Sequence, residues 1–205
     1  MTSFPKQGLY AITQPEHKSL IQVTEEVTAA IKGGAAVIQY RDKQPVDGKK
    51  LAIKLLEICR NNNVPLIIND DIDLAASIGA DGVHLGQDDG QLSDARKKLA
   101  QNAIIGVSCY NDLQRALTVQ SQGATYVAFG RFFPSPSKPL APLAKIDTLC
   151  LAKQQIRIPI VAIGGILPKN GAQLIAVGAD FLAAIDGVFA LDPEQSARNY
   201  QRLFE

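Results

Sequence analysis

Eight short apolar runs, rich in β-branched and aromatic residues, recur along this chain of 205 residues, and amphipathic segments separate them. Most of the runs are nearly continuous in apolar residues, which is typical of parallel strands buried on both faces. This repeat limits the chain to folds that alternate strands and helices. The expected strands span residues 8–13, 35–41, 65–69, 81–86, 103–108, 124–130, 159–164 and 180–185.

The segments between the runs predict helices, because their apolar side chains recur at helical spacing. We expect Asn111 to cap one of these helices and Asp192 to cap the last, with Pro193 at its first position. Glycines such as Gly123 and Gly178 follow two helices as stop signals. The expected helices span residues 18–32, 47–61, 112–122, 168–177 and 193–204.

Eight strand-helix units fill the chain from end to end, and no Pro/Ser-rich linker interrupts them. The count predicts a single-domain (β/α)8 TIM barrel over residues 1–205, near the low end of the size range for that fold. The alternative is an open doubly wound sheet, which needs fewer strands and leaves the eight regular repeats unexplained.

Charge and cysteine usage narrow the class of protein. Twenty-one Lys and Arg against twenty Asp and Glu give a formal net charge of +1, which argues against a dedicated nucleic-acid binder. No apolar run approaches the roughly 18–20 residues that a membrane span needs. The three cysteines are dispersed and form no CxxC pair, which fits a reducing compartment. We therefore expect a cytoplasmic protein.

Polar residues collect just after the runs, where a barrel builds its active site. Residues two apart on a strand share a face, so Gln39, Arg41 and Lys43 point one way while Tyr40 and Asp42 point the other. An Arg fork and a Lys point charge at one barrel mouth suit an anion with several oxygens. The alternative is that these cations are solvated and pair with the Asp42 carboxylate.

Carboxylates follow two neighbouring strands. Asp70 and Asp89 come from adjacent strand ends and could share one Mg2+, which takes one or two carboxylates plus phosphate oxygens of a substrate. The alternative is helix capping, a role that Asp71 and Asp73 are placed to fill.

A third group of residues suggests a phosphate site. Gly164 and Gly165 precede a helix start, and glycines there let backbone N–H groups approach a phosphate; for a lone Gly-Gly pair, an ordinary tight turn is the competing interpretation. The segment 130–140 is long and polar, and it adds Ser135, Ser137 and Lys138.

The two histidines do not predict acid-base catalysis. His17 lies in a polar loop and is expected to be exposed, and His84 lies within an apolar run and is interpreted as a satisfied core histidine. The site is therefore rich in anion binders and poor in nucleophiles. This composition favours electrostatically driven phosphate-ester or pyrophosphate chemistry.

Taken together, these residues resemble the thiamine-phosphate synthase family over nearly the whole chain. The resemblance rests on QYRDK (39–43), PLIINDDIDLA (65–75), GADGVHLGQDD (79–89), IIGVS (104–108), GRFFPSPSKP (130–139), IPIVAIGGI (158–166) and GAD (178–180). It implies a (β/α)8 barrel that joins a pyrimidine diphosphate to a thiazole phosphate. In that family, departure of diphosphate is assisted by Mg2+ and passes through a pyrimidine cation.

The resemblance also implies roles for particular residues. Arg41, Lys43, Lys138 and Ser108 would be catalytic, and Asp70 and Asp89 would bind Mg2+. The implied substrate-binding residues are Gln39, Tyr40, Arg41, Asp42, Lys43, Asn69, Ser108, Ser135, Pro136, Ser137, Lys138, Gly164, Ile185 and Asp186.

Two positions depart from the family pattern. The family loop usually reads T-x-T-K, whereas this chain has Ser135-Pro136-Ser137-Lys138, which keeps both hydroxyls. The end of strand 8 often has Ser where this chain has Asp186. A carboxylate about 4 Å from a phosphate would cost about 4 kcal/mol at an effective dielectric near 20. We therefore expect the Asp186 side chain to turn away while its backbone N–H donates.

Two other functions compete with synthesis. A thiazole tautomerase-like paralogue would share the barrel and the phosphate site, but it would not need Arg41, Lys43, Asp70, Asp89 and Lys138 together. A non-catalytic thiamine-precursor binding protein draws support only from Asp186. As partners we expect the two small-molecule substrates, neither nucleic acid nor membrane, and the sequence leaves a homo-oligomer open.

Overall fold

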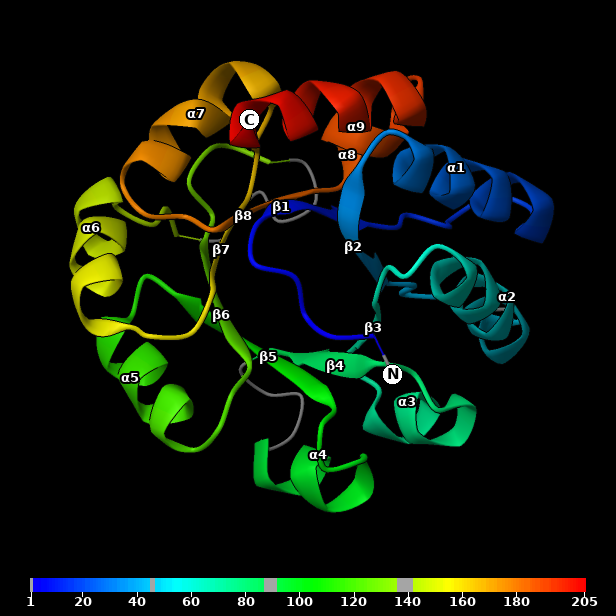
Figure 1. The fold of residues 1–205 in the computed structure, drawn as a ribbon, viewed down its shortest axis with the longest axis horizontal. Coiled ribbons are helices and arrows are strands. Elements are labelled where there is room, and N and C mark those ends of the chain that lie inside the picture. Colours follow the sequence, from blue (N-terminus) through cyan, green and yellow to red (C-terminus); the bar gives the residue numbers. More distant parts are fainter. Residues whose placement is uncertain (1, 45–46, 87–91, 136–141) are drawn as a thin grey trace.

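Eight parallel strands close into a barrel in chain order, each hydrogen-bonded to the next and β8 to β1 (Figure 1). The structure is a computed structural model that describes residues 2–44, 47–86, 92–135 and 142–205. The strands are β1 (Gly8–Ile12), β2 (Ala35–Tyr40), β3 (Leu66–Asn69), β4 (Gly82–Leu85), β5 (Ile104–Tyr110), β6 (Tyr126–Gly130), β7 (Ile160–Ile163) and β8 (Phe181–Ala184).

Helices form a ring around the barrel, as Figure 1 shows along the barrel axis. A 3-10 turn over Arg202–Phe204 follows the last of them. The helices are α1 (Leu20–Lys32), α2 (Gly48–Asn61), α3 (Ile72–Ile78), α4 (Leu92–Lys98), α5 (Leu113–Ser121), α6 (Ile146–Gln155), α7 (Pro168–Ala176), α8 (Asp186–Phe189) and α9 (Pro193–Gln201). The predicted (β/α)8 barrel is confirmed, and the closed ring of strands excludes the open sheet.

Two of the expected helix caps are confirmed, whereas Asp73 lies inside the first turn of α3 and pairs with Lys98 instead of capping the helix. Asp71 and Asp192 cap α3 and α9 as expected, because their carboxylates accept hydrogen bonds from the first-turn amides. The prediction for Asn111 was wrong. Asp112 caps α5 by accepting from the amide of Arg115 at 2.9 Å. The Asn111 side chain instead accepts from the amide of Lys145 at 2.8 Å, which ties the end of β5 to the start of α6.

The apolar residues form two layers because successive strand residues face opposite sides of the barrel wall. The larger layer lies between the strands and the helices, with Leu9, Ile38 and Ile68 among its fully buried residues. The smaller layer fills the barrel interior. Its buried members are Tyr10, Ile12, Val37, Ile67, Ile104, Tyr126, Ala128, Val161, Phe181 and Ala183.

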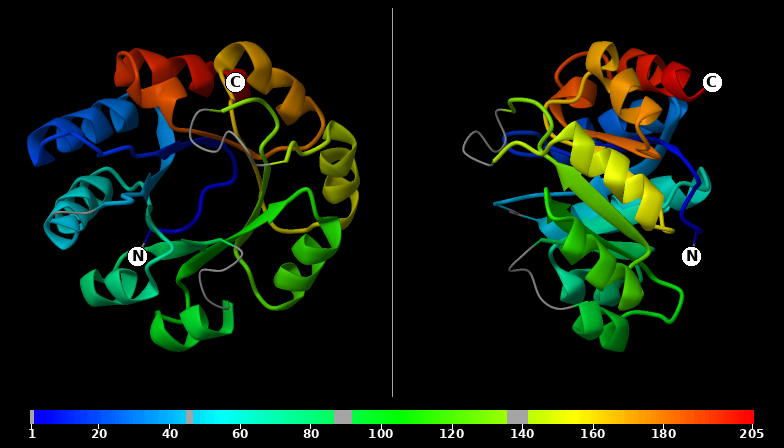
Figure 2. Two further views of the ribbon diagram at one scale, coloured as in Figure 1. Left: turned by 180° about the vertical axis from the view of Figure 1, so that it is seen from behind. Right: turned by 90° about the vertical axis from the view of Figure 1, so that its left-hand side faces the viewer.

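The segment before β1 lies across one end of the barrel. Phe4 stacks on Tyr126, with ring centroids 4.6 Å apart and planes 2° apart, and it also contacts Phe181. The fully buried carboxylate of Asp81 accepts hydrogen bonds from the backbone amides of Thr2 at 2.7 Å and Leu66 at 3.0 Å. The side view in Figure 2 places this segment at the end of the barrel away from the loop that follows β6. That end is therefore closed, and the other is left for a site.

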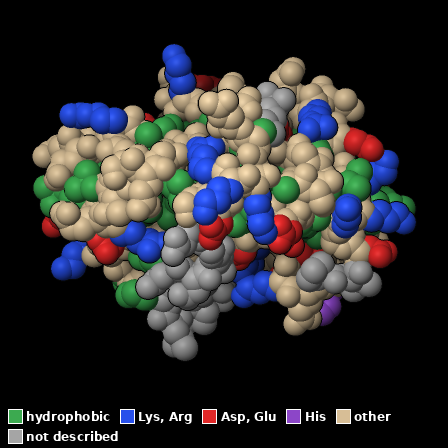
Figure 3. Space-filling view, turned by 90° about the horizontal axis from the view of Figure 1, so that it is seen from below, with side chains coloured by type: hydrophobic (Ala, Val, Ile, Leu, Met, Phe, Trp, Pro, Cys, Tyr) green, Lys and Arg blue, Asp and Glu red, His purple; other side chains and the backbone are tan. Residues whose placement is uncertain are grey.

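The surface shows no separation of charge on the face drawn in Figure 3, where Lys and Arg side chains are interspersed with Asp and Glu side chains. The ion pairs of the described residues lie at the surface, such as Lys18 with Glu26 at 2.8 Å and Lys153 with Asp180 at 2.7 Å. None of the helices in the described ranges combines the length and apolar character needed to cross a bilayer.

Candidate active site

A cavity of about 550 Å³ opens at the carboxyl ends of the strands, and residues from every strand or the segment after it line it. This is where a barrel enzyme places its active site. Most of the residues implied by the resemblance meet there. Those that line the cavity are Gln39, Arg41, Lys43, Asn69, Asp70, Ser108, Ser135, Gly164, Ile185 and Asp186.

Two of the predicted residues that the structure describes, Tyr40 and Asp42, lie outside the cavity. Tyr40 belongs to the layer between strands and helices, and its hydroxyl donates to Asp42 at 3.2 Å, so neither side chain lines the cavity. This arrangement follows the alternation of β2, which turns Gln39 inward and Tyr40 outward. Asp89, Pro136, Ser137 and Lys138 lie outside the described residues.

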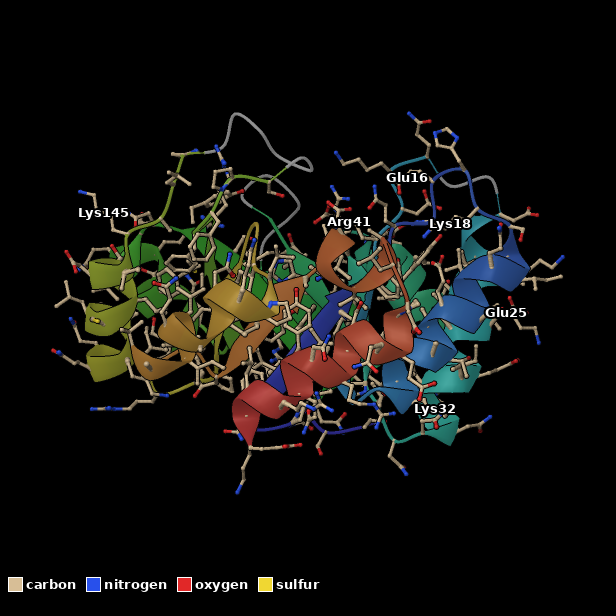
Figure 4. The ribbon with its side chains drawn as sticks, turned by 90° about the horizontal axis from the view of Figure 1, so that it is seen from above. Glu16, Lys18, Glu25, Lys32, Arg41 and Lys145 are labelled. Atoms are coloured by element: carbon tan, nitrogen blue, oxygen red, sulfur yellow. The ribbon has the colours of Figure 1, made fainter. Side chains whose placement is uncertain are left out.

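The end of β2 supplies two cations, Arg41 and Lys43. Thr13 holds this strand end in place: its amide donates to the carbonyl of Gln39 at 2.9 Å, and its hydroxyl accepts from the amide of Arg41 at 3.1 Å. Figure 4 shows Arg41 at the same edge of the molecule as Glu16, whereas Lys32, at the far end of α1, lies at the opposite edge. Two cations at one cavity mouth suit a multiply charged anion.

The end of β3 supplies a carboxylate. Asp70 adopts a left-handed backbone conformation with a φ of 64°, and its amide donates to the carbonyl of His84 at 2.8 Å. The Asn69 amide nitrogen donates to the Asp70 carboxylate at 2.5 Å. This side chain is exposed at the cavity wall. An exposed, oriented carboxylate is the kind of oxygen ligand that Mg2+ takes together with phosphate oxygens.

The described residues hold no cluster of three or more His, Cys, Asp or Glu side chains that could bind a metal by themselves. Asp70 alone fits the pattern of Mg2+ sites in which one or two carboxylates share the ion with a substrate phosphate. The second expected ligand, Asp89, is outside the described ranges.

Close packing explains the two glycines after β7. Gly164 and Gly165 have φ values of 100° and 63°, which disfavour a side chain. A Cβ at Gly164 would overlap Arg131, and one at Gly165 would overlap the carbonyl oxygen of Pro134. The segment after β6 thus crosses directly over this turn. Asn170 holds the turn from the other side by donating to the carbonyl of Gly165 at 3.1 Å.

Several backbone amides at this turn and at the start of α8 face the cavity. Within the described residues, the N–H groups of Gly165, Ile166 and Gly187 donate no hydrogen bond to the protein, although Ile166 is only 3% exposed. All three residues line the cavity, and Gly187 lies in the first turn of α8. Backbone N–H groups without a protein acceptor at a cavity wall can bind an anion, so we call these three amides the amide cradle. Asp186 precedes Gly187 and is exposed.

The polar side chains inside the barrel do not follow from the spacing of residues along the sequence. Tyr10, Tyr126 and His84 line the cavity and are linked to Gln39 and Ser108 by hydrogen bonds of 2.7–2.9 Å. Burial raises the pKa of both the Tyr10 and the Tyr126 hydroxyl above the ordinary value, so both stay protonated. His84 is satisfied, as expected, but it belongs to the site rather than to the apolar core.

A closed (β/α)8 barrel with polar and charged groups around a cavity at the carboxyl ends of its strands is the architecture of a barrel enzyme. The family model described as "Thiamine monophosphate synthase" matches residues 9–188. The chain belongs to this family, and it is a transferase.

Curated relatives match over nearly their full length. A thiamine-phosphate synthase of Methylococcus capsulatus is 48% identical over 204 residues, which cover 98% of this chain and 91% of the relative. One from Nitrosococcus oceani is also 48% identical, over 97% of this chain and 93% of the relative.

Solved structures agree with these matches. A thiamine phosphate pyrophosphorylase from Pyrococcus furiosus aligns with a TM-score of 0.87 and 31% identity over 97% of this chain and 95% of its own. A 3-hexulose-6-phosphate synthase aligns with a TM-score of 0.72 and 18% identity, covering 96% of this chain and 99% of its own, which shows a shared fold alone.

Proposed function

We propose that this chain joins 4-amino-5-hydroxymethyl-2-methylpyrimidine diphosphate to hydroxyethylthiazole phosphate, or to its carboxylated form, and releases thiamine phosphate and diphosphate. The observation that carries this proposal is the presence of two anion-binding groups in one cavity. Arg41 and Lys43 lie after β2. The amides of Gly165, Ile166 and Gly187, which have no acceptor among the described residues, lie after β7 and β8. Two separate sets suit two phosphorylated substrates.

The cation set suits the diphosphate. Arg41 and Lys43, with Asn69 and Ser108, would bind its oxygens and stabilise the negative charge that grows as the carbon–oxygen bond breaks. The bonding electrons leave with the diphosphate, and the thiazole nitrogen then forms the new carbon–nitrogen bond with the resulting pyrimidine cation. The chain needs no nucleophile of its own for this step.

The amide cradle suits the thiazole monophosphate, because backbone N–H groups bind phosphate oxygens without a neutralising side chain. Gln39 suits the pyrimidine: its amide nitrogen donates to Tyr10 at 2.9 Å, which leaves its carbonyl oxygen for the amino group of the substrate. Both substrates would thus be held by groups that the barrel fixes in advance.

Mg2+, held by Asp70 with Asp89, is the second part of the proposal. The bound ion would supply charge neutralisation for the departing diphosphate. The exposed Asp70 carboxylate, oriented by Asn69, supports this assignment. A cytoplasmic location is also proposed, and it is supported by the three free cysteines at positions 59, 109 and 150.

One assay tests the proposed reaction. The purified chain is incubated with both substrates and Mg2+, and thiamine phosphate and diphosphate are measured. Formation of both products in equal amounts is expected, together with loss of activity when a chelator removes divalent metal. Absence of product with every divalent metal tried would refute synthesis and favour the tautomerase or the binding protein.

A further inference from the structure

Five polar side chains form a continuous hydrogen-bonded chain across the interior of the barrel. The Gln39 amide nitrogen donates to the Tyr10 hydroxyl at 2.9 Å, and the Tyr10 and Tyr126 hydroxyls lie 2.7 Å apart. The Tyr126 hydroxyl lies 2.9 Å from Nδ1 of His84, and Nε2 of His84 lies 2.9 Å from the Ser108 hydroxyl. All five side chains line the cavity, and Tyr10, Tyr126 and Gln39 are at most 3% exposed.

The chain of hydrogen bonds has one direction, and the Gln39 amide sets it. An amide nitrogen only donates, so the Tyr10 oxygen accepts from it. The single hydrogen of Tyr10 then has Tyr126 as its acceptor. The hydrogen of Tyr126 has Nδ1 of His84 as the remaining acceptor. The reverse direction would leave the Tyr10 hydrogen buried with no acceptor among the described residues. The free energy lost by such an unpaired donor exceeds the free energy that one hydrogen bond contributes.

The direction fixes the form of His84. A ring whose Nδ1 accepts from Tyr126 carries its hydrogen on Nε2, and this Nε2–H donates to the Ser108 oxygen. His84 therefore carries a hydrogen on Nε2 that faces Ser108.

The backbone of Ser108 is held by contacts outside this series of hydrogen-bonded side chains. Ser108 lies at a register shift between β5 and β6, and its carbonyl accepts from the Arg115 side chain at 2.9 Å. Rotation of its hydroxyl is the freedom that remains. With its oxygen already accepting from His84, the hydroxyl hydrogen turns toward the cavity.

We propose that His84 is a positioning residue. Through the series of hydrogen bonds that begins at Gln39, it orients the Ser108 hydroxyl toward the cavity as a hydrogen-bond donor to the substrate diphosphate. The proposal rests on the proposed function in one respect, because it takes the diphosphate as the anion beside Ser108. This series of hydrogen bonds also connects the pyrimidine end of the proposed site, at Gln39, to the diphosphate end, at Ser108.

The form of His84 is tested without turnover. The chain has two histidines, so a His17→Gln variant labelled with 15N histidine reports on His84 alone. We expect a hydrogen on Nε2, and Tyr126→Phe should change the Nδ1 signal. A ring with its hydrogen on Nδ1 and none on Nε2 would overturn the proposal even if the chain made no thiamine phosphate.

Kinetics test the positioning role. The amide of Asn reaches only the position of Nδ1, whereas that of Gln reaches the position of Nε2 and can donate to Ser108. We expect His84→Asn to lower kcat/KM for the pyrimidine diphosphate about tenfold, as Ser108→Ala does, and His84→Gln to lower it by less than about threefold. The KM for thiazole phosphate should not change.

The double variant decides whether His84 acts through Ser108. If it does, His84→Asn combined with Ser108→Ala is no slower than Ser108→Ala alone. Multiplied losses, of about a hundredfold, would show independent roles and refute the proposal, as would equal losses for Asn and Gln. Calorimetric titration with inorganic diphosphate and Mg2+ should give the same ranking of variants, and it remains informative if the reaction itself is not observed.

Discussion

The hydroxyl of Tyr200, in the last helix, donates to the carbonyl of Ile166 at 2.8 Å, and the amide of Ile166 belongs to the cradle proposed for the thiazole phosphate. Tyr200 is fully buried, and a Cβ at Gly187 would overlap its hydroxyl. A residue of the outer ring of helices thus packs directly behind two of the three cradle amides. The outer ring of helices would therefore support the proposed phosphate site without touching the substrate.

Replacing this tyrosine should affect one substrate only. In Tyr200→Phe we expect the KM for thiazole phosphate to rise about fivefold and the free energy of unfolding to fall by about 1 kcal/mol, because one buried hydrogen bond is lost. Steady-state kinetics and urea unfolding measure both. Tyr40→Phe is the matched control, since its hydroxyl contacts Asp42 away from the cavity. An equal rise in KM in both variants would contradict the assignment.

Glycine at position 165 should be required for packing as well as for backbone conformation. Gly165→Ala forces a Cβ against Pro134, whereas Gly123→Ala meets nothing within 4 Å although its φ is also positive, at 90°. We expect Gly123→Ala to cost about 1 kcal/mol of unfolding free energy and Gly165→Ala clearly more. Urea titration compares the unfolding free energies of the two variants. Equal losses would mean that the loop over Gly165 moves aside without cost.

The proposed metal site predicts a specific dependence on Mg2+. Asp70→Asn should raise the Mg2+ concentration for half-maximal activity at least tenfold, because a neutral amide is a weaker ligand than a carboxylate. Asp89→Asn should behave alike, and excess Mg2+ should restore part of both activities. Asp73→Asn is the control, as Asp73 pairs with Lys98 at 2.6 Å on the surface. An unchanged Mg2+ requirement in Asp70→Asn would remove that residue from the site.

The three cysteines should differ in reactivity. Burial raises the pKa of the Cys59 and Cys109 thiols to about 12, and both side chains are fully buried, whereas Cys150 is partly exposed. At pH 8, we expect a thiol reagent to label Cys150 alone in the native protein and all three in denaturant. Mass spectrometry after digestion identifies the labelled positions. Fast native labelling of Cys109 would contradict its burial beneath the end of β5.

The buried tyrosines predict loss of stability at alkaline pH. Desolvation raises the pKa of Tyr10 above its ordinary value of 10.0, so below pH 10 both the folded and the unfolded chain keep this proton. Above pH 10 the unfolded chain releases it first, and the unfolding free energy falls by up to about 1.4 kcal/mol per pH unit for each such phenol. Tyr10→Phe should lose stability less steeply between pH 10 and 12. Parallel curves for both proteins would show that Tyr10 ionises freely when folded.

The barrel and the rim of its cavity could be predicted because both follow from local pattern. Strand spacing gives the fold, and alternation along β2 separates Gln39, Arg41 and Lys43 from Tyr40 and Asp42. The cap of α5 shows where local pattern fails. Asn111 and Asp112 are both good caps, and only the contact of Asn111 with Lys145, distant in sequence, decides between them.

The polar interior could not be predicted for a related reason. Tyr10 and Tyr126 occupy inward positions that read as apolar core, and their hydroxyls meet only because β1 and β6 face each other across the barrel. No spacing along the chain encodes a contact between strands that are not neighbours. His84 in β4 reads as a core residue for a similar reason, since its partner Tyr126 comes from β6, which is not next to β4.

The packing of Phe4 against Tyr126 has a consequence for folding. These residues lie far apart in the sequence, and contacts of high sequence separation form late because a long loop must close first. The ring that carries the central hydroxyl of the site is therefore fully supported only after the first and sixth strands have met. Acquisition of substrate affinity should then coincide with the final, cooperative closure of the barrel, and a partly folded intermediate should have helices but no affinity for diphosphate.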